Sequence, residues 1–410
     1  MNPLFLFTVM AAATASGGEA TIATLDGRTI SGDINAWTAT ELSLNTASGQ
    51  TKLPASEVLE VRWSREAVEA AGATHIELID GSRISYGELT IAKREAVFTG
   101  GFLSQPLRIP RDAIRLIELR PSTPFITSAI QEIERKEIPG DALVVSQRDS
   151  ETMDYLTGVI GDVTAEQATF EWDGERVPVK RSKIAAMVFY QPRQPALPDA
   201  ACELSLTDGS RITAREISLG EGRLSVTTPV GVVLEVPLDQ VAGADFSSGK
   251  IAYLSDLTPT GVSWTPGLGL PKTDLFTEKN LPRSDASFSG SPLSLLWNDD
   301  AARSRRDVRT YAKGLALRSR TEVTYRLPQG MKRFSTVAGL DPDNRGGGNL
   351  SLVIRGDDRV LWEGVLDGAQ PPVEIDVELG AARRLHLVVD YGEYLDFGDR
   401  LHLVEARVTK

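Results

Sequence analysis

The sequence Thr207-Asp208-Gly209-Ser210-Arg211-Ile212 repeats an element that occurs twice earlier, as Leu25-Asp26-Gly27-Arg28-Thr29-Ile30 and as Ile79-Asp80-Gly81-Ser82-Arg83-Ile84. Each copy is typical of a strand, a tight Asp-Gly turn and a second strand, because glycine tolerates the positive φ that such a turn requires. A motif that recurs along the chain in this way indicates several duplicated β-units.

A second shared element follows each copy: an apolar residue and a proline, with another apolar residue four positions after the proline. It occurs as Leu53-Pro54 to Val58, Ile109-Pro110 to Ile114, and Val236-Pro237 to Val241. A fourth, degenerate copy has Leu156-Thr157-Gly158 in its second strand and closes with Val179-Lys180 to Ile184. In that copy lysine replaces the proline and the Asp-Gly turn is lost.

Between these anchors apolar and polar residues alternate, which predicts short strands with one buried face. We expect four tandem, small antiparallel β-units over residues 20–63, 74–121, 141–191 (the degenerate copy) and 201–248. The pattern loosely resembles Sm-like small barrels. We interpret these units as structural spacers.

One connector between the second and third units is predicted to be helical, over residues 122–138. Thr123 supplies an N-cap hydroxyl and Pro124 occupies the first helical position. Four apolar residues share one face of this helix, which predicts that it packs against its neighbours. They are Ile126, Ala129, Ile130 and Ile133.

After Gly249 the short repeat anchors disappear and strand patterns separated by turns predominate from Gly314 onward. Strands are predicted over residues 322–327, 350–355, 359–362, 373–377, 385–389 and 404–408. That number of strands fits a two-sheet jelly roll over residues 249–410. The whole chain is therefore predicted to be all-β.

Several ordered motifs of this last region resemble the NPCBM family, a carbohydrate-binding type of module with a galactose-binding-like β-sandwich. The motifs are Tyr253-Leu254-Ser255-Asp256-Leu257, the stretch from Lys313 to Glu322, Val337-Ala338-Gly339-Leu340-Asp341, and Gly398-Asp399-Arg400-Leu401 through Glu405-Ala406-Arg407. The sequence has Arg318 and Arg400 where family members often carry histidine, and Leu403 where they often carry tryptophan.

The resemblance implies that Arg318, Asp399, Arg400 and Glu405 lie near each other and bind sugar hydroxyls. Trp362, like Trp297, is a candidate plate beneath the apolar face of a sugar ring. The competing interpretation is that the charged residues form a structural cluster and that the tryptophans belong to the core.

Acidic residues recur at intervals of three at Asp390, Glu393, Asp396 and Asp399, and such oxygen ligands suit Ca²⁺. The resemblance adds that galactose-binding-like sandwiches often hold a structural calcium. Asp390 and Asp396 are the candidate ligands; the alternative is a solvated acidic loop without a metal. No other cofactor is expected.

Composition excludes several classes of function. Lys+Arg 44 against Asp+Glu 56 gives a net charge of −12 without an evident basic face, which argues against nucleic-acid binding. The single cysteine, Cys202, permits no internal disulfide, and three histidines are too scattered for a metal or catalytic centre. No nucleophile elbow or zinc-protease motif is present, and we expect no enzymatic activity.

At the N-terminus, residues 4–13 are apolar and Ala13-Thr14-Ala15 fits a signal-peptidase site, which predicts a signal peptide over residues 1–15. The alternative is a buried first strand. No other apolar run approaches the length of a membrane span. We therefore expect an exported bacterial protein of periplasmic or extracellular location.

Two functions remain open. The first is non-catalytic attachment to a glycan or polysaccharide through the C-terminal sandwich. The second is a structural or scaffold role in which the sandwich has lost sugar binding and contacts another protein, such as a protein of the cell envelope.

Overall fold

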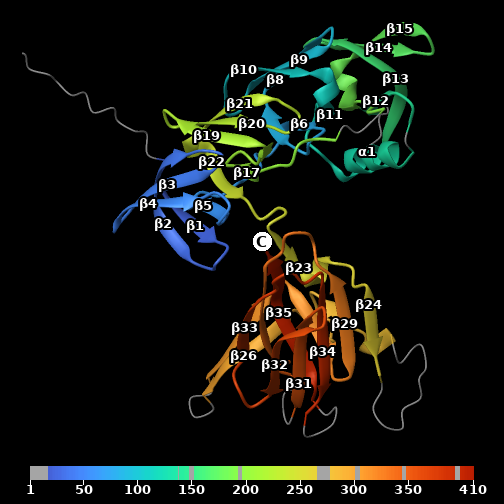
Figure 1. Ribbon diagram of the computed structural model, residues 1–410. Helices are drawn as coiled ribbons and strands as arrows, with labels where there is room; N and C mark the ends of the chain where they lie inside the picture. Colours follow the sequence, from blue (N-terminus) through green and yellow to red (C-terminus); the bar gives the residue numbers. More distant parts are fainter. Residues whose placement is uncertain are drawn as a thin grey trace, which may run out of the picture. The chain divides into compact units, whose positions relative to one another are not determined.

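The computed structural model describes residues 17–136, 138–146, 152–192, 196–265, 278–300, 305–343, 348–392 and 398–410. Strands dominate throughout, which confirms the predicted all-β class (Figure 1). The chain divides into two compact units, Met1–Ser248 and Gly249–Lys410, each with its own buried core. In the described part of the chain, no helix has the length and hydropathy needed to span a bilayer.

All four repeats of the N-terminal unit follow one plan, in which the last strand pairs antiparallel with the first. The first repeat contains β1 (Glu19–Thr24), β2 (Thr29–Trp37), β3 (Glu41–Thr46), β4 (Gly49–Pro54) and β5 (Val58–Trp63). The second contains β6 (Thr74–Leu78), β7 (Arg83–Tyr86), β8 (Glu88–Ala92), β9 (Glu95–Gly100), β10 (Leu103–Pro110), the 3₁₀ turn η1 (Arg111–Ala113) and β11 (Ile114–Glu118).

Like the second repeat, the other two end in a 3₁₀ turn and a last strand. The third contains β12 (Asp141–Ser146), β13 (Met153–Val163), β14 (Gln167–Trp172), β15 (Glu175–Lys180), η2 (Arg181–Lys183) and β16 (Ile184–Val188). The fourth contains β17 (Cys202–Leu206), β18 (Arg211–Ala214), β19 (Glu216–Gly220), β20 (Arg223–Thr227), β21 (Val233–Pro237), η3 (Leu238–Gln240) and β22 (Val241–Asp245).

The proline of the closing motif begins the 3₁₀ turn that precedes the last strand of two repeats. Pro110 and Pro237 have φ of −58° and −60°, the range to which the pyrrolidine ring confines this angle. Lys180 adopts −59° at the same position of the third repeat. Lysine can replace proline there because the required φ is accessible to any residue.

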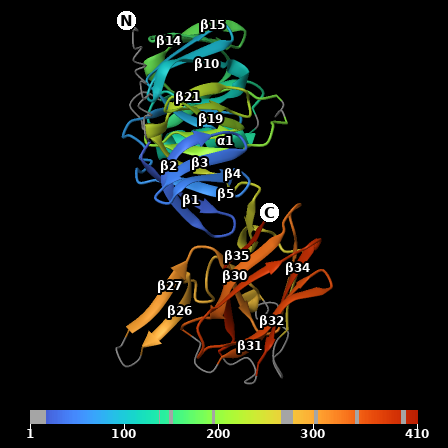
Figure 2. The same cartoon turned by 60° about the vertical axis from the view of Figure 1, so that its left-hand side comes forward.

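Strands of all four repeats pair in one sheet and share one core, β19–β21 of the fourth repeat form a separate three-stranded sheet, and the tandem arrangement is not confirmed. β5 of the first repeat pairs with β22 of the fourth, β18 of the fourth with β7 of the second, and β11 of the second with β16 of the third. The spatial order is therefore first, fourth, second, third. Figure 2 shows it as a succession from β1–β5 through β19 and β21, then β10, to β14 and β15.

Two buried serines join the inner repeats at their Asp-Gly turns. The Ser210 hydroxyl accepts the Ser85 N–H at 2.9 Å, and reciprocally the Ser82 hydroxyl accepts the Thr213 N–H at 3.1 Å. In the first repeat the position of Ser82 is occupied by Arg28, whose side chain is exposed. The serine is thus present in the two repeats whose turns meet, and absent from the outer first repeat.

Helix α1 (Pro124–Lys136) confirms the predicted connector. The Thr123 hydroxyl accepts the Ile126 N–H at 3.3 Å, as expected of an N-cap. All four predicted apolar residues, Ile126, Ala129, Ile130 and Ile133, are buried. They pack against the face of β11, β12 and β16 that points away from the main core.

The C-terminal unit is a sandwich of two antiparallel sheets, as predicted (Figure 1). One sheet contains β25 (Arg283–Ser284), β28 (Gly314–Arg318), β35 (Arg400–Thr409), β30 (Arg333–Leu340) and β33 (Val373–Glu378), with β23 (Ile251–Tyr253) paired to β35. The other contains β24 (Gly261–Trp264), β29 (Thr321–Arg326), β34 (Arg384–Tyr391), β31 (Asn349–Gly356) and β32 (Arg359–Asp367). Apolar residues from both sheets form the core between them.

A two-stranded ribbon covers part of the outer face of the first sheet (Figure 2). It is formed by β26 (Leu293–Asp300) and β27 (Arg305–Tyr311). Leu293 and Leu295 of β26 pack on Ala316 and Val404, and all four side chains are fully buried. This second, smaller core fixes the surroundings of the candidate site.

Candidate functional site

Arg318 and Arg400 lie side by side on the outer face of the first sheet. Arg318 ends β28, Arg400 begins β35, and the two residues are direct antiparallel partners. Their neighbours Leu317 and Leu401 are buried in the sandwich core. Because side chains alternate along a strand, both arginines point away from that core. The structure thus brings together two of the predicted residues.

An aromatic ring that the sequence did not single out completes this face. The Arg318 guanidinium carbon lies 4.6 Å from the centroid of the Phe288 ring, and that of Arg283 lies 5.5 Å from it. Both distances fall within the range of cation–π attraction. Arg283 and Phe288 come from residues 259–292, which are rich in Pro, Gly and Ser, and nothing local indicates that they meet Arg318. We call Arg283, Phe288, Arg318 and Arg400 the arginine face.

Asp399 lies beside this face but its carboxylate is directed into the protein. The side chain is 3% exposed, and its Oδ1 accepts the Asn349 N–H at 3.0 Å. This hydrogen bond ties the start of β31 to the start of β35. Asp399 therefore anchors the loops at this end of the sandwich, and no exposed carboxylate oxygen is offered to a ligand by this residue.

His402 anchors the ribbon beside the arginine face. It is fully buried, and its Nδ1 lies 2.9 Å from the carbonyl oxygen of Ser294 on β26. Its Nε2 lies 3.8 Å from an Asp341 carboxylate oxygen. Burial lowers the pKa of His402 below its usual value, more than the Ser294 carbonyl and Asp341 raise it.

Glu405 does not join the arginine face, contrary to the expected convergence. β28 and β35 run antiparallel with Gly314 opposite Val404 and Arg318 opposite Arg400, so Glu405 lies beyond the other end of β28. There it accepts the Tyr253 hydroxyl at 3.3 Å and pairs with Arg407 at 3.6 Å. Arg400 and Glu405 are close in sequence, but five residues of a strand span about 16 Å, which places them at different ends of β28.

Trp362 also lies elsewhere, on β32 opposite the core residue Ile354. Its half-buried ring packs against the sandwich core and lies over Gly364, where an added methyl group would be 2.6 Å from a ring carbon. This placement agrees with the core interpretation and gives Trp362 no contact with the arginine face. Trp297 donates its Nε1–H to Tyr311 at 2.8 Å, with the Arg309 guanidinium 4.7 Å from its ring centroid.

The structure does not test the calcium ligands predicted from the sequence. Asp390 is exposed on β34 and accepts the main-chain N–H of Tyr391 at 2.8 Å. Asp396 lies outside the described residues. Within the described ranges no three His, Cys, Asp or Glu side chains gather as a metal site would require. Calcium binding remains a prediction.

Comparison with known protein families identifies the C-terminal unit. Residues 251–409 match the model of the NPCBM/NEW2 domain. The C-terminal unit is an NPCBM/NEW2 domain. The match covers about two fifths of the chain and leaves the N-terminal repeats unassigned.

Solved structures with detectable similarity include bacterial CBM51 modules. CBM51 of Clostridium perfringens GH95 in complex with methyl-galactose is 22% identical, covering 39% of this chain and 99% of that one. CBM51-2 with INT domains of C. perfringens ZmpB, in complex with GlcNAc, is 22% identical, covering 47% of this chain and 39% of that one. The tandem CBM51 modules of Sp3GH98 from Streptococcus pneumoniae are 14% identical, covering 82% of this chain and 88% of that one.

All three structures have a TM-score of 0.32, which is too low to transfer a site or a ligand to the NPCBM/NEW2 domain. The chain spans only 39% of the length of the ZmpB fragment. No curated protein matches the chain.

Proposed function

We propose that the protein attaches non-catalytically to glycans through its NPCBM/NEW2 domain. The observation that carries this proposal is the family match over residues 251–409. The arginine face supports it, because guanidinium N–H groups can donate hydrogen bonds to sugar hydroxyls beside a half-buried aromatic ring. Neutral sugars are the first ligands to try, because their hydroxyls can accept these hydrogen bonds.

A second candidate function is contact with another protein through the same face. It is favoured by one observation: the carboxylates expected to accept bonds from sugar hydroxyls are engaged elsewhere. Asp399 holds the main chain of Asn349, and Glu405 holds Tyr253 and Arg407. In this alternative the domain serves as a scaffold, for instance for an envelope protein.

We further propose that the protein is exported and acts in the periplasm or outside the cell. The support is the apolar segment and small-residue cleavage pattern of residues 4–15, which lie outside the described residues. N-terminal sequencing of protein purified from the native envelope should give Ser16 as the first residue. An N-terminus at Met1 would contradict export by this route.

A glycan array probed with the intact chain tests the binding function. The double variant Arg318→Ala/Arg400→Ala should weaken binding to neutral oligosaccharides at least about tenfold, since each charged hydrogen bond contributes on the order of 1.5–3 kcal/mol. Arg355→Ala is the matched control, because Arg355 is an exposed arginine on the other sheet.

Retention of neutral-glycan binding by Arg355→Ala, with loss in the double variant, supports the proposal. Absence of binding to every neutral glycan, together with a protein partner that the double variant no longer retains, supports the scaffold function instead. Circular dichroism of each variant separates loss of binding from loss of fold.

A further inference from the structure

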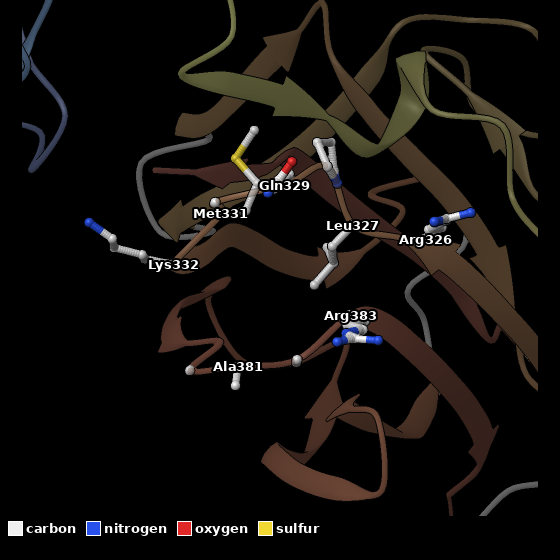
Figure 3. A pocket seen from close by; sticks show the side chains of 11 residues that line it. Arg326, Leu327, Gln329, Met331, Lys332, Ala381 and Arg383 are labelled. Carbon is white, nitrogen blue, oxygen red and sulfur yellow. The ribbon is translucent and has the colours of Figure 1, made fainter.

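A pocket lies at the end of the sandwich remote from the arginine face. Arg326, which lines it, ends β29, whereas Arg318 and Arg320 precede the start of this strand. The pocket has a volume of about 800 Å³ and lies between two segments, residues 326–332 and 380–383. Figure 3 shows Leu327 pointing into the space between them, with Lys332 and Arg326 at opposite sides. This volume is typical of a small-molecule site.

Main-chain hydrogen bonds hold the two segments in place. The Leu327 N–H donates to the Arg383 carbonyl at 2.9 Å, and the Leu379 N–H donates to the Lys332 carbonyl at 2.7 Å. Leu327 and Met331 belong to the sandwich core and are 8% and 7% exposed. The pocket therefore has an apolar floor that is part of the rigid fold and needs no ligand to form it.

Three cationic side chains, Arg326, Lys332 and Arg383, stand around this floor, and all are exposed. No ion pair to any of them is found among the described residues, and no carboxylate lines the pocket. Asp357 contacts the main-chain N–H groups of Arg383 and Arg384 but is not a lining residue. A concentration of unneutralised positive charge is unexpected on a chain of net charge −12.

We propose that this pocket binds an acidic saccharide whose uronic-acid carboxylates are distributed over Arg326, Lys332 and Arg383. The planar guanidinium group of each arginine matches one carboxylate, and the ammonium of Lys332 can hold another. Leu327 and Met331 provide an apolar surface for the C–H face of the sugar ring, and the Gln329 amide can bond a hydroxyl. That the ligand is a sugar rests on the proposed function; that it is anionic rests on the pocket alone.

Isothermal titration of the intact chain with a trigalacturonate tests the assignment. The matched neutral sugar is a trigalactose, and inorganic sulfate distinguishes a saccharide site from a general anion site. The variant Arg326→Gln/Lys332→Gln/Arg383→Gln removes the three charges and keeps polar side chains. Arg355→Gln serves as the control, because it removes an exposed positive charge outside the pocket.

The proposal predicts that trigalacturonate binds the wild type and Arg355→Gln equally and binds the triple variant at least about tenfold more weakly. Salt near 1 M, where the Debye length is roughly 3 Å, should weaken this binding further. Unchanged trigalacturonate binding by the folded triple variant would overturn the proposal, as would absence of trigalacturonate binding or equal binding of sulfate alone.

The experiments distinguish failure of the acidic-saccharide proposal from failure of the proposed function. Neutral-glycan binding that depends on Arg318 and Arg400, without any effect of trigalacturonate, refutes the acidic pocket and leaves the proposed function intact. Trigalacturonate binding without any neutral-glycan binding supports the pocket and refutes neutral-sugar recognition at the arginine face.

Discussion

Arginines of the N-terminal repeats and the cations of the two candidate binding regions in the NPCBM/NEW2 domain have different surroundings. In the N-terminal repeats arginines face carboxylates: Arg83 pairs with Glu69 and Glu118, and Arg111 pairs with the buried Asp141. In the NPCBM/NEW2 domain the arginine face contacts an aromatic ring, and the cations of the pocket at the other end of the sandwich have no carboxylate partner among the described residues. Other arginines of the domain, Arg309, Arg333 and Arg407, do pair with carboxylates, so the contrast concerns the arginine face and the pocket alone.

This difference follows from what each unit must hold together. The repeats meet at strand pairs whose ends carry charged side chains, and burial there requires that each charge be compensated. The sandwich is closed by its apolar core, and the cations of the pocket form no ion pair among the described residues, so the fold does not depend on pairing them. We expect substitutions in the repeats to lower stability and substitutions of the domain's cations to change binding.

The largest effect on stability is expected from Arg111→Met. Its removal leaves the Asp141 carboxylate, whose side chain is 8% exposed, without its ion-pair partner. Breaking a buried pair in this way costs about 3–5 kcal/mol. Urea unfolding followed by hydrogen exchange should show the loss in residues 17–248 and no change in the NPCBM/NEW2 domain.

Arg108→Met is the matched control, because its pair with Glu95 in the same repeat is exposed on both sides. Its removal should change the free energy of unfolding by less than about 1 kcal/mol. An equal effect of the two substitutions would contradict the structural role of the buried pair.

A smaller effect is expected from the serines that join the inner repeats. Ser82→Ala and Ser210→Ala each leave a main-chain N–H, of Thr213 or Ser85, without its acceptor. Each should lower the free energy of unfolding by about 1–3 kcal/mol. Ser218→Ala, at an exposed position of β19, should have no measurable effect in the same thermal or urea titration.

If the two serine substitutions proved neutral, the reciprocal hydrogen bonds would not stabilise the junction. The double variant adds a further test. Its loss of stability should differ from the sum of the single losses if the two bonds form one cooperative junction.

The smallest effects on stability are expected when the pH is changed. In Glu118, burial raises the pKa, but the hydrogen bond of His75 and the charge of Arg83 outweigh it, and the pKa lies below its usual 4.5. In His402, burial lowers the pKa below its usual 6.5. In both groups the unfolded chain takes up a proton at higher pH than the folded chain, so stability is lost as pH falls below the unfolded value.

The NPCBM/NEW2 domain should therefore begin to lose the His402 contribution near pH 6.5, and the repeats should begin to lose the Glu118 contribution near pH 4.5. Hydrogen exchange of both units across this range measures the two onsets separately. His402→Gln should remove the earlier onset, and an onset that persists in this variant would show that another group causes it.

Much of the fold could be predicted from the sequence because it depends on local signals. The Asp-Gly turns, the apolar residues of α1 and the strand alternation each act within a few residues, and the structure agrees with them. The spatial order of the repeats could not be predicted, because pairing between β18 and β7 joins residues far apart in sequence. The first repeat has Arg28 at the position of Ser82 and Ser210, and this difference was the one local sign that it lies at the end of the succession.

The candidate site was predicted only in part for the same reason. Arg318 and Arg400 could be placed together from the family resemblance, but Phe288 could not, since it comes from a segment without periodicity. Glu405 was placed with them by the same resemblance and Trp362 was a candidate plate by residue type, and only strand register shows that they lie elsewhere. The basic pocket had no sequence signal, because Lys332 and Arg383 are brought together by main-chain bonds between distant segments.

Hydrogen-exchange footprinting of the intact chain with trigalactose and with trigalacturonate tests most directly whether ligand contact belongs to the NPCBM/NEW2 domain. We predict protection by trigalactose around residues 283–288, 316–320 and 398–402, and by trigalacturonate around residues 326–332 and 379–383. Protection confined to residues 17–248 with both sugars would contradict the assignment of binding to the C-terminal unit.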